Sequence, residues 1–430
     1  MKPSTYNVIF KLSNDTALIF NTRTGALIYV EEFSGISNVN SNEELLALSA
    51  GGFVVEENFD ELSEIKDRFS RAQENEKSLS LTILAAEACN MKCPYCFIHE
   101  QRELVISSET LHGIYNYIEK RKDKLDRIWI SWFGGEPMLV HSKIISFMKR
   151  ISDLLKNQDI ELNSNIVTNG VLLTKSRFNE YLANGISEFQ VTLDGDQGTH
   201  DMYRSLKTGE GTFSNIWKNL KEIKNIQKNY SFLIRGNFTR KTISGMESLA
   251  AKFTSSFGND KRFSIYFRPV YNFSTVDDRI DILANDVLGF EEGVFEQNRL
   301  GNLSGNNFTH RYLSDGHLPR PLYTWCNTEQ KNSFIVGADG KLFKCDNYIG
   351  NGDESVGVLF KDGTISLNSR YDEWISSSIY NTDEERCIGC EFLPICQGGC
   401  PRSRYEDKTE CFWTKAVLFD AIKHHVSNSN

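Results

Sequence analysis

Segments with strand-like and helix-like patterns alternate roughly six times between residues 79 and 270. The first pair is SLSLTILAA, which predicts a strand, and SSETLHGIYNYIEKRKDK, in which apolar residues recur with helical spacing. Such alternation is typical of a parallel sheet, because a helix must carry the chain back before each new strand. We therefore expect an α/β fold, a partial (β/α)6 TIM-like barrel, with its active site at the C-terminal ends of the strands.

The other segments of this region carry the same two patterns. Strands are predicted in RIWISWF, ELNSNIVTNG, EFQVTLDG, SFLIRGNFTR and RFSIYFRPV. Helices are predicted in SKIISFMKRISDLLKN, TKSRFNEYLANG, TFSNIWKNLKEIKNIQKN and SGMESLAAKFTSSF. We assign residues 79–310 to one core domain.

Residues 1–78 carry a different pattern. YNVIFKL and ALIFNTRTGALIYVEE predict strands around the turn NTRTG, and a short helix, a further strand and a charged helix follow. We expect a small α+β, winged-helix-like domain without a catalytic motif. From residue 326 onward the strand and helix signals weaken and cysteines begin, so residues 311–430 are expected to form a third domain.

Composition and charge argue against several classes of protein, namely nucleic-acid binders, secreted proteins and membrane-spanning proteins. The net charge of −9 and the pI near 5.5 argue against a general nucleic-acid binder, which normally shows a basic stripe. The N-terminus lacks the continuous apolar core and small-residue cleavage site of a signal peptide, and no apolar run is long enough to span a bilayer. We therefore expect a cytoplasmic protein that binds neither nucleic acid nor membrane.

The ten cysteines are unevenly placed, which favours metal sites over the disulfides that a reducing compartment disfavours. Three of them form the cluster Cys89-x3-Cys93-x2-Cys96. A [4Fe–4S] cube is normally held by four thiolates, so three local cysteines leave one iron open to a chelating ligand such as S-adenosylmethionine (SAM). Zinc or three incidental thiols are the alternatives, although a structural zinc site needs four ligands.

This loop resembles the signature of the radical SAM superfamily, since a predicted strand precedes it and the aromatic Tyr95 stands before its last cysteine. The resemblance implies a [4Fe–4S] cluster that binds SAM and cleaves it reductively. The product, a 5′-deoxyadenosyl radical, would abstract hydrogen from a substrate. An electron donor of the flavodoxin or ferredoxin type is implied as a partner.

Motifs at the ends of the following predicted strands support the resemblance. It implies that Glu136 in FGGEP (Phe133–Pro137) and nearby carbonyls bind the amino group of SAM, that Arg204 pairs with its carboxylate, and that Arg235 approaches the adenosine. Taken alone, FGGEP is also a tight turn, and Arg235 is a surface or core-edge arginine. The expected cofactor-binding residues are Tyr95, Gly134, Gly135, Glu136, Pro137, Asn165, Asn169, Asp194, Arg204 and Arg235.

The C-terminal cysteines resemble a SPASM domain, and with the core this resemblance covers roughly residues 79–415. It implies two auxiliary [4Fe–4S] clusters, one on Cys387, Cys390, Cys396 and Cys411, and the other on Cys326, Cys345 and Cys400. Sulfatase maturases have a further cysteine shortly after the first, and CNTEQKNSF offers none. The second auxiliary cluster would then have an open iron or a noncysteine ligand. Zinc in a CxxC knuckle is the alternative.

Most radical SAM proteins with a SPASM domain modify peptides or proteins. Residues 1–78 resemble the leader-binding element of peptide-maturation enzymes, with YNVIFKL and ALIYVEE as edges to which a leader peptide adds as a strand. We therefore expect thioether formation in a ribosomally made precursor peptide, as in the sactipeptide and ranthipeptide synthases, including the PapB type. A structural cap on the barrel is the alternative for residues 1–78.

Three other functions stay open at this point. Some sulfatase maturases use an aspartate as proton acceptor at the position of Asp346, directly after Cys345, so Asp346 is a candidate catalytic base, or else a turn residue. This would favour oxidation of Cys or Ser to formylglycine. Carbon–carbon crosslinking of a peptide uses the same machinery. The non-enzyme alternative is an iron–sulfur protein that transfers electrons or binds peptides.

Overall fold

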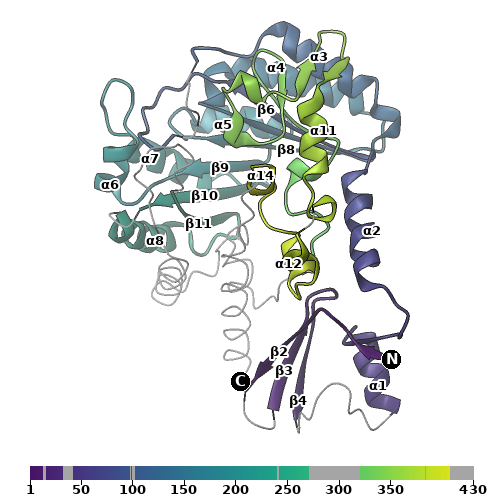
Figure 1. Cartoon of the computed structure of the whole chain (residues 1–430). Coiled ribbons are helices and arrows are strands. Elements are labelled where there is room, and N and C mark those ends of the chain that lie inside the picture. Colours follow the sequence, from purple (N-terminus) through teal and green to yellow (C-terminus); the bar gives the residue numbers. More distant parts are fainter. Residues whose placement is uncertain are drawn as a thin grey trace. The chain divides into compact units, whose positions relative to one another are not determined.

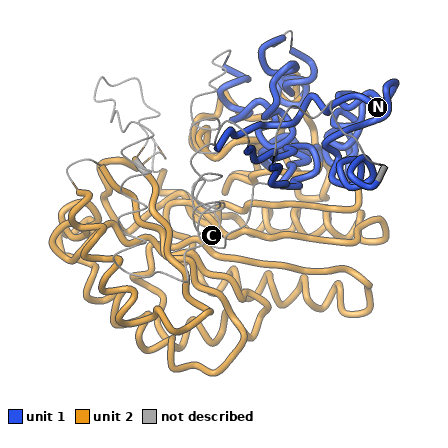
Figure 2. The backbone as a smooth tube through the Cα atoms, turned by 90° about the horizontal axis from the view of Figure 1, so that it is seen from below, with its two compact units in different colours: residues 1–75, 315–331, 372–430 blue, residues 76–314, 332–371 orange. Residues whose placement is uncertain are grey.

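The computed structural model describes residues 1–12, 16–31, 42–96, 98, 102–239, 242–270, 320–382 and 384–406. Cys411 lies outside these residues. The chain divides into two compact units, which Figure 2 distinguishes by colour. The first unit comprises residues 1–75, 315–331 and 372–430, and the second comprises residues 76–314 and 332–371.

Six parallel strands form the centre of the second unit, as the alternating pattern predicts (Figure 1). Each strand pairs with the next one along the chain. The strands are β6 (Ser78–Ala86), β7 (Arg127–Gly134), β8 (Glu161–Thr168), β9 (Glu188–Thr192), β10 (Ser231–Phe238) and β11 (Phe263–Pro269). The predicted α/β fold with a partial (β/α)6 barrel is confirmed.

Five of the six described α-helices that lie between these strands in the chain were predicted. They are α3 (Ser108–Glu119), α4 (His141–Leu155), α5 (Lys175–Ala183), α7 (Phe213–Lys224) and α8 (Ile243–Phe257). The Ser107 and Thr174 side chains cap the first turns of α3 and α5 by accepting backbone N–H bonds. The α4 helix buries Ile144, Phe147 and Ile151, whose spacing places them on one face.

The strands bury one face and leave the other partly open. On β7, Ile128, Ile130 and Trp132 are fully buried, whereas Trp129 and Ser131 between them are only partly buried. A similar alternation recurs on β8 and β10, where the partly buried positions include the polar Asn165, Arg235 and Asn237 and the apolar Val167 and Leu233. The apolar core therefore lies on the buried face of the sheet, and the opposite face is only partly buried and carries both polar and apolar residues.

The sheet continues beyond the predicted six strands. Strand β12 (Ser333–Val336) pairs in parallel with β6, and three antiparallel strands follow it in the sheet. These strands are β13 (Lys341–Phe343), β14 (Gly357–Leu359) and β15 (Ile365–Leu367). Residues 332–371 thus group with the core and not with the cysteine-rich segments, which differs from the three consecutive domains expected from the sequence. Strands of three or four residues are too short to give a clear period-two signal.

One short helix of the core was not predicted. The α6 helix (Gln197–Tyr203) follows β9, and the Asp196 side chain caps it by accepting the Thr199 N–H. The sequence signal was the Asp at its N-cap, but seven residues give too few turns for a helical repeat of apolar residues. This helix leads directly to Arg204.

The N-terminal part of the first unit has the predicted small α+β structure. An antiparallel sheet in the order β2-β3-β4 lies near the helix α1 (Asn42–Ala50), and the helix α2 (Glu61–Gln73) follows (Figure 1). The strands are β2 (Asn7–Lys11), β3 (Thr16–Asn21) and β4 (Ala26–Glu31), with a separate short pair, β1 (Lys2–Pro3) and β5 (Val54–Val55). The turn NTRTG joins β3 and β4, and Gly25 supplies its positive φ of 78°.

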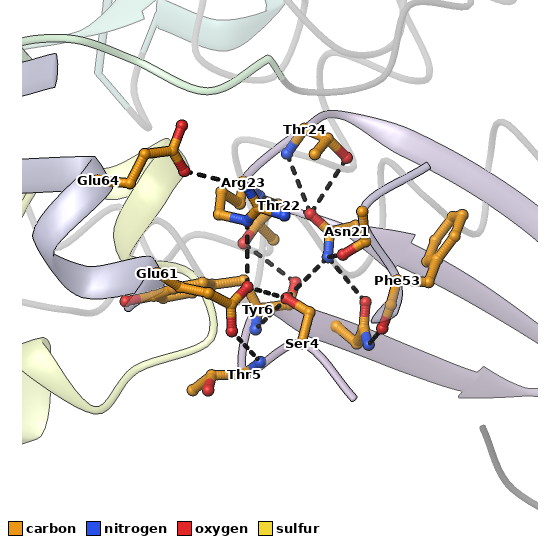
Figure 3. A network of polar contacts seen from close by, with 12 residues as sticks. Ser4, Thr5, Tyr6, Asn21, Thr22, Arg23, Thr24, Phe53, Glu61 and Glu64 are labelled. Carbon is orange, nitrogen blue, oxygen red and sulfur yellow. Dashed lines mark hydrogen bonds and ion pairs between the residues drawn. The ribbon is translucent and has the colours of Figure 1, made fainter. Parts of the chain in front are cut away.

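A buried polar network fixes this turn (Figure 3). The Asn21 side chain, which is fully buried, donates to Ser4 Oγ at 3.0 Å and to the Gly52 carbonyl at 2.9 Å. Glu61 of α2 accepts from Arg23 Nε at 3.1 Å and from the Thr5 N–H at 2.9 Å. Because each buried polar group has a partner, the network holds the turn, the chain start and α2 in one arrangement.

The same unit contains residues from the far end of the chain. Tyr6 and Ile65 pack with Ile379 and Leu393 in one apolar cluster. The Thr22 hydroxyl donates to the Glu391 carbonyl at 2.5 Å. The N-terminal sheet and the cysteine-rich segment are therefore parts of one compact unit. A winged-helix-like, leader-binding role for residues 1–78 stays a prediction.

Candidate functional site

A cavity lies at the C-terminal ends of the parallel strands of the second unit. It encloses about 1010 Å³ of empty space, part of which is open solvent. Cys89, Cys93 and Cys96 all line it. Active sites of such barrels occupy this end of the strands. The first cysteine cluster is thus at the expected place.

The cysteine loop is partly buried and internally bonded. The Met91 N–H donates to Cys89 Sγ at 3.4 Å, and the Cys96 N–H donates to the Cys93 carbonyl at 3.2 Å. Burial raises the pKa of the Cys89 thiol to about 11 and also raises the pKa of Cys93. Without a bound cation these two thiols stay protonated at neutral pH, and a metal must displace their protons.

An ion pair between the buried Glu87 and the partly exposed Arg102 joins the two ends of the cysteine loop. Arg102, which follows the loop, donates from Nε and Nη2 to both carboxylate oxygens of Glu87, at 2.6 and 2.7 Å. The Glu87 side chain is 1% exposed. Arg102 Nη1 also donates to Asp339, which follows β12, at 3.1 Å. This bidentate contact fixes the span that carries the three cysteines.

Replacing Arg102 by methionine should lower the free energy of unfolding by about 2 kcal/mol, because it leaves the Glu87 carboxylate buried without its cation. Arg127→Met is the matched control, since the ion pair of Arg127 with Glu161 is more than half exposed on both sides, and we expect a change within about 0.5 kcal/mol. Denaturant unfolding of both variants measures the difference. Equal losses would show that the buried pair has no special role.

The glycines of FGGEP allow the end of β7 to approach the start of the cysteine loop. A Cβ on Gly134 would stand 2.1 Å from the Ala86 carbonyl oxygen, and one on Gly135 would stand 2.5 Å from that of Glu87. The Gly135 and Glu136 N–H groups donate to the carbonyls of Ala86 and Ala88, at 2.8 and 2.9 Å. Both glycines line the cavity, so the backbone here is available to a ligand.

The Glu136 carboxylate is fully buried and already bonded. It accepts from Met138 N at 2.9 Å, Thr168 Oγ1 at 2.8 Å and Asn169 N at 2.8 Å. Burial raises its pKa, and these bonds oppose the rise. Glu136 therefore joins the ends of β7 and β8, with Pro137 buried beside it at the start of a 3-10 turn, η2 (Pro137–Val140). Its predicted contact with the amino group of SAM stays a prediction.

Tyr95, Asp194 and Arg204 meet although they come from three different segments. The Tyr95 hydroxyl donates to the Asp194 carboxylate, and Arg204 Nη1 donates to the Tyr95 oxygen at 2.8 Å. The same Nη1 lies 3.6 Å from Asp194 Oδ2, which makes an ion pair. Asn237 holds the other Asp194 oxygen through its N–H at 2.8 Å. Arg204 lines the cavity, and its Nε is buried without a hydrogen-bond partner in the described structure.

Of the remaining predicted cofactor-binding residues, two line the cavity and one does not. Asn169 lines the cavity and donates to Asn90 at 2.7 Å, and Arg235 lines it while donating to Asn237 at 2.9 Å. Asn165 does not line the cavity, although its Oδ1 is buried without a hydrogen-bond partner among the described residues. The SAM contacts of all three stay predictions.

Several cavity residues were missed from the sequence. Gln190 and Thr192 lie two apart on β9, as Arg235 and Asn237 do on β10, and all four line the cavity. Period-two spacing from Arg235 would have indicated Asn237. Met91 also lines the cavity, but no pattern separates it from a core methionine.

His200 is structural, as isolated histidines usually are. It is fully buried, its Nδ1 accepts from the Asp194 N–H at 3.1 Å, and its Nε2 lies 2.9 Å from the Thr212 hydroxyl. Burial lowers its pKa well below the usual value, so the ring is neutral at physiological pH. It supports the backbone of Asp194.

Asp346 stands outside the cavity. Its carboxylate is exposed and lies 3.7 Å from Cys345 Sγ, at the start of the 3-10 turn η5 (Asp346–Tyr348). Tyr348 and Cys96 nevertheless pack on one apolar cluster that contains Ile349, so this segment adjoins the first cysteine loop. A catalytic role of Asp346 stays a prediction.

The later cysteines are distributed over both units. Cys387 lies in α12 (Glu385–Ile388), Cys396 ends α13 (Leu393–Cys396), and Cys400 directly precedes α14 (Pro401–Tyr405), all in the first unit with Cys390. Cys326 is in this unit too, and it is exposed, as Cys400 is. Cys345 is buried and belongs to the second unit. The assignment of these residues to two auxiliary clusters stays a prediction.

The cavity residues fit a cluster with SAM. Among the described residues, no three cysteine, histidine or carboxylate side chains are arranged to hold a single metal ion. In a cube each thiolate binds a different iron, so the sulfurs need only line a common space, as Cys89, Cys93 and Cys96 do. Arg204 lines the cavity together with Gly134 and Gly135, and its Nε has no partner in the described structure, so a carboxylate bound in the cavity would find a cation in its wall.

Residues 83–243 match the family model of the radical SAM superfamily. The chain is 24% identical over 422 residues to a radical SAM cyclopropyl synthase, TigE, of Paramaledivibacter caminithermalis, covering 92% of this chain and 83% of that protein. It is 24% identical over 348 residues to a cysteine-type anaerobic sulfatase-maturating enzyme of Clostridium novyi, covering 76% of this chain and 89% of that protein.

The fold is also similar to a solved structure of Streptococcus suis SuiB bound to precursor peptide SuiA. The TM-score is 0.56 at 16% identity, and the match covers 97% of this chain and 99% of SuiB. At this identity the likeness shows the fold alone. No helix in the described ranges is long and apolar enough to cross a membrane.

Proposed function

This chain is a radical SAM enzyme, and we propose that it forms thioether crosslinks, from a cysteine sulfur to a carbon, in a ribosomally made precursor peptide. The observation that carries the proposal is the cavity, in which Cys89, Cys93 and Cys96, with no fourth cysteine among the described lining residues, lie with Arg204, whose Nε has no partner in the described structure.

Within this proposal, Cys89, Cys93 and Cys96 hold the cluster, and Arg204 with the backbone of Gly134 and Gly135 holds SAM. The bound cluster and SAM together supply a radical that removes a carbon-bound hydrogen. Tyr95 and Asp194 keep the Arg204 guanidinium in place by hydrogen bonding and charge. Arg235 and Asn237 form the wall on β10, where the substrate would approach.

The substrate class is supported by the N-terminal sheet. In the order β2-β3-β4, both β2 and β4 are edge strands, and they correspond to the predicted edges YNVIFKL and ALIYVEE. Tyr29 on β4 is 52% exposed and Ile9 on β2 is 41% exposed. Apolar side chains along an open edge suit the addition of an extended leader peptide as a further strand.

The extent of the similarities supports the same substrate class. The cyclopropyl synthase and SuiB match 92% and 97% of this chain, whereas the sulfatase-maturating enzyme matches 76%. SuiB is solved with a precursor peptide. A precursor peptide is therefore the preferred partner, with two auxiliary clusters as the electron acceptor and a flavodoxin- or ferredoxin-type protein as the electron donor.

Mass spectrometry of a precursor peptide co-expressed with this chain tests the proposal. Closing a thioether removes a hydrogen atom from carbon, a proton from the thiol and one electron, so the peptide should lose the mass of two hydrogens. Its cysteine should also resist alkylation. A lighter peptide whose thiol still alkylates would instead support carbon–carbon crosslinking, and an unchanged mass would reject both reactions.

Sulfatase maturation is the second candidate, because the Clostridium novyi relative is named for it and Asp346 follows Cys345. Its product differs, since the target Cys or Ser of a sulfatase becomes formylglycine. An aldehyde-specific probe on a co-expressed sulfatase distinguishes the two. A positive aldehyde signal with no modification of any precursor peptide would favour this second candidate.

A further inference from the structure

Arg404 is a buried charge that the proposed chemistry does not use. Its side chain is 1% exposed and forms an ion pair with Glu329, whose side chain is 3% exposed. A buried pair of this kind is costly to desolvate, and replacing it with apolar residues is often neutral for stability. Stability alone therefore does not account for it, and its contacts are informative.

Three of the four hydrogen bonds that Arg404 donates go to residues close to cysteines in the chain. Nη1 donates to the Gln397 carbonyl at 3.1 Å and to the Gly399 carbonyl at 2.7 Å, both between Cys396 and Cys400. Nε donates to the Ser377 carbonyl at 3.0 Å. Nη2 donates to Glu329.

Glu329 extends this arrangement to Cys326. Its Oε2 accepts from the Trp325 N–H at 2.7 Å and from the Cys326 N–H at 3.3 Å. The carboxylate thus holds the backbone at Cys326, while its other oxygen holds Arg404. One ion pair therefore spans from Cys326 to the Cys396–Cys400 loop, within the first unit.

The loop between Cys396 and Cys400 needs such support because its backbone is unusual. Gln397, Gly398 and Gly399 all have positive φ, of 50°, 74° and 75°, and Gln397 is not a glycine. Left-handed backbone at a residue with a Cβ is disfavoured and must be held by its surroundings. Arg404 binds the carbonyls at both ends of this run, and the Gln397 side chain accepts from the Tyr380 hydroxyl at 2.6 Å.

We propose that Arg404, through its pair with Glu329, is the positioning residue that presents Cys326, Cys396 and Cys400 as ligands for the auxiliary clusters. This inference rests on the proposed function, in which these cysteines bind iron. The planar guanidinium is suited to this role because its N–H groups can donate to acceptors in several directions at once. It fixes the thiols before any iron arrives, without binding iron itself.

Arg404→Lys tests this proposal after anaerobic reconstitution of the full chain with iron and sulfide. Lysine keeps a positive charge opposite Glu329, so the protein should fold, but its single ammonium cannot reach all the acceptors of Arg404. We expect the variant to lose most of the iron that wild type carries beyond the SAM-binding cluster. The SAM-sensitive electron paramagnetic resonance signal of that cluster, whose ligands are in the second unit, should persist.

Arg71→Met is the control, since Arg71 is an exposed arginine of α2 in the same unit, and it should load iron as wild type does. If Arg404 only neutralised Glu329, Arg404→Lys would load fully, which would overturn the proposal. If the lysine variant does not fold, the double variant Glu329→Met with Arg404→Met removes both charges. A folded double variant with complete auxiliary iron would likewise overturn it.

The iron content of the wild-type protein shows whether a negative result refutes the auxiliary clusters themselves or only the positioning role of Arg404. Wild-type protein that binds only the iron of one cluster would refute the auxiliary clusters, and the positioning role with them. Wild-type protein that binds more, together with a fully loaded lysine variant, would refute the positioning role alone.

Discussion

Replacing Cys93 by alanine should reduce SAM cleavage to the background of cluster-free protein. Cys93 lines the cavity beside Cys89 and Cys96, and two thiolates cannot hold a cube that three hold with one iron open. Anaerobic reconstitution with a chemical reductant, followed by measurement of 5′-deoxyadenosine, gives the result. Because Cys93 is only partly buried, the variant should fold, which circular dichroism checks.

Cys387→Ala is the control for the loss of SAM cleavage expected in the Cys93 variant. Cys387 belongs to the first unit and Cys93 to the second, so the Cys387 variant should retain some SAM cleavage but form no crosslinked peptide. Retained cleavage in the Cys93 variant would refute the three-cysteine cluster. Equal loss of cleavage in both variants would indicate that Cys387→Ala disrupts the whole protein.

Replacing Arg204 by methionine should raise the Kd for SAM roughly 10- to 100-fold, since charge-assisted hydrogen bonds contribute about 1.5–3 kcal/mol. The structure gives the reason, because Arg204 lines the cavity with a buried Nε that has no partner in the described part of the chain. Binding of SAM to cluster-loaded protein by equilibrium dialysis measures the change. The iron content should stay at the wild-type level.

Arg150→Met is the matched control for Arg204. Arg150 lies on α4, where its guanidinium stacks over the Tyr115 ring, and it does not line the cavity. The variant should bind SAM as wild type does. A Kd for Arg204→Met within threefold of wild type would show that another group holds the carboxylate.

Much of the core was predictable because its signals are local. The segment SLSLTILAA corresponds to β6 (Ser78–Ala86), and the other five strands lie within their predicted segments to within a residue. The cysteines follow the first strand and Glu136 follows the second, so the end of the sheet that carries the site could be inferred from chain order. Strand β12 was missed, because four residues carry little periodic signal.

Burial changed the role of some predicted residues. Glu136 stood out in the sequence through its motif, yet its carboxylate is occupied by three bonds that join β7 to β8. Arg102 and Glu87 stood out in no motif, yet they close the cysteine loop. A motif indicates that a residue has a role in the site. Only the contacts of its side chain in the structure show whether it stabilises the protein around the site or is available to a ligand.

The sequence by itself determined the parallel α/β core, the cysteine loop after its first strand and the motifs at the strand ends. These depend on the spacing of residues that are near each other in the chain. Only the tertiary structure decided that Tyr95, Asp194 and Arg204 meet, and that Arg404 joins Glu329. Such contacts depend on the register of whole strands and on which side chains are excluded from water, and neither is encoded in a local pattern.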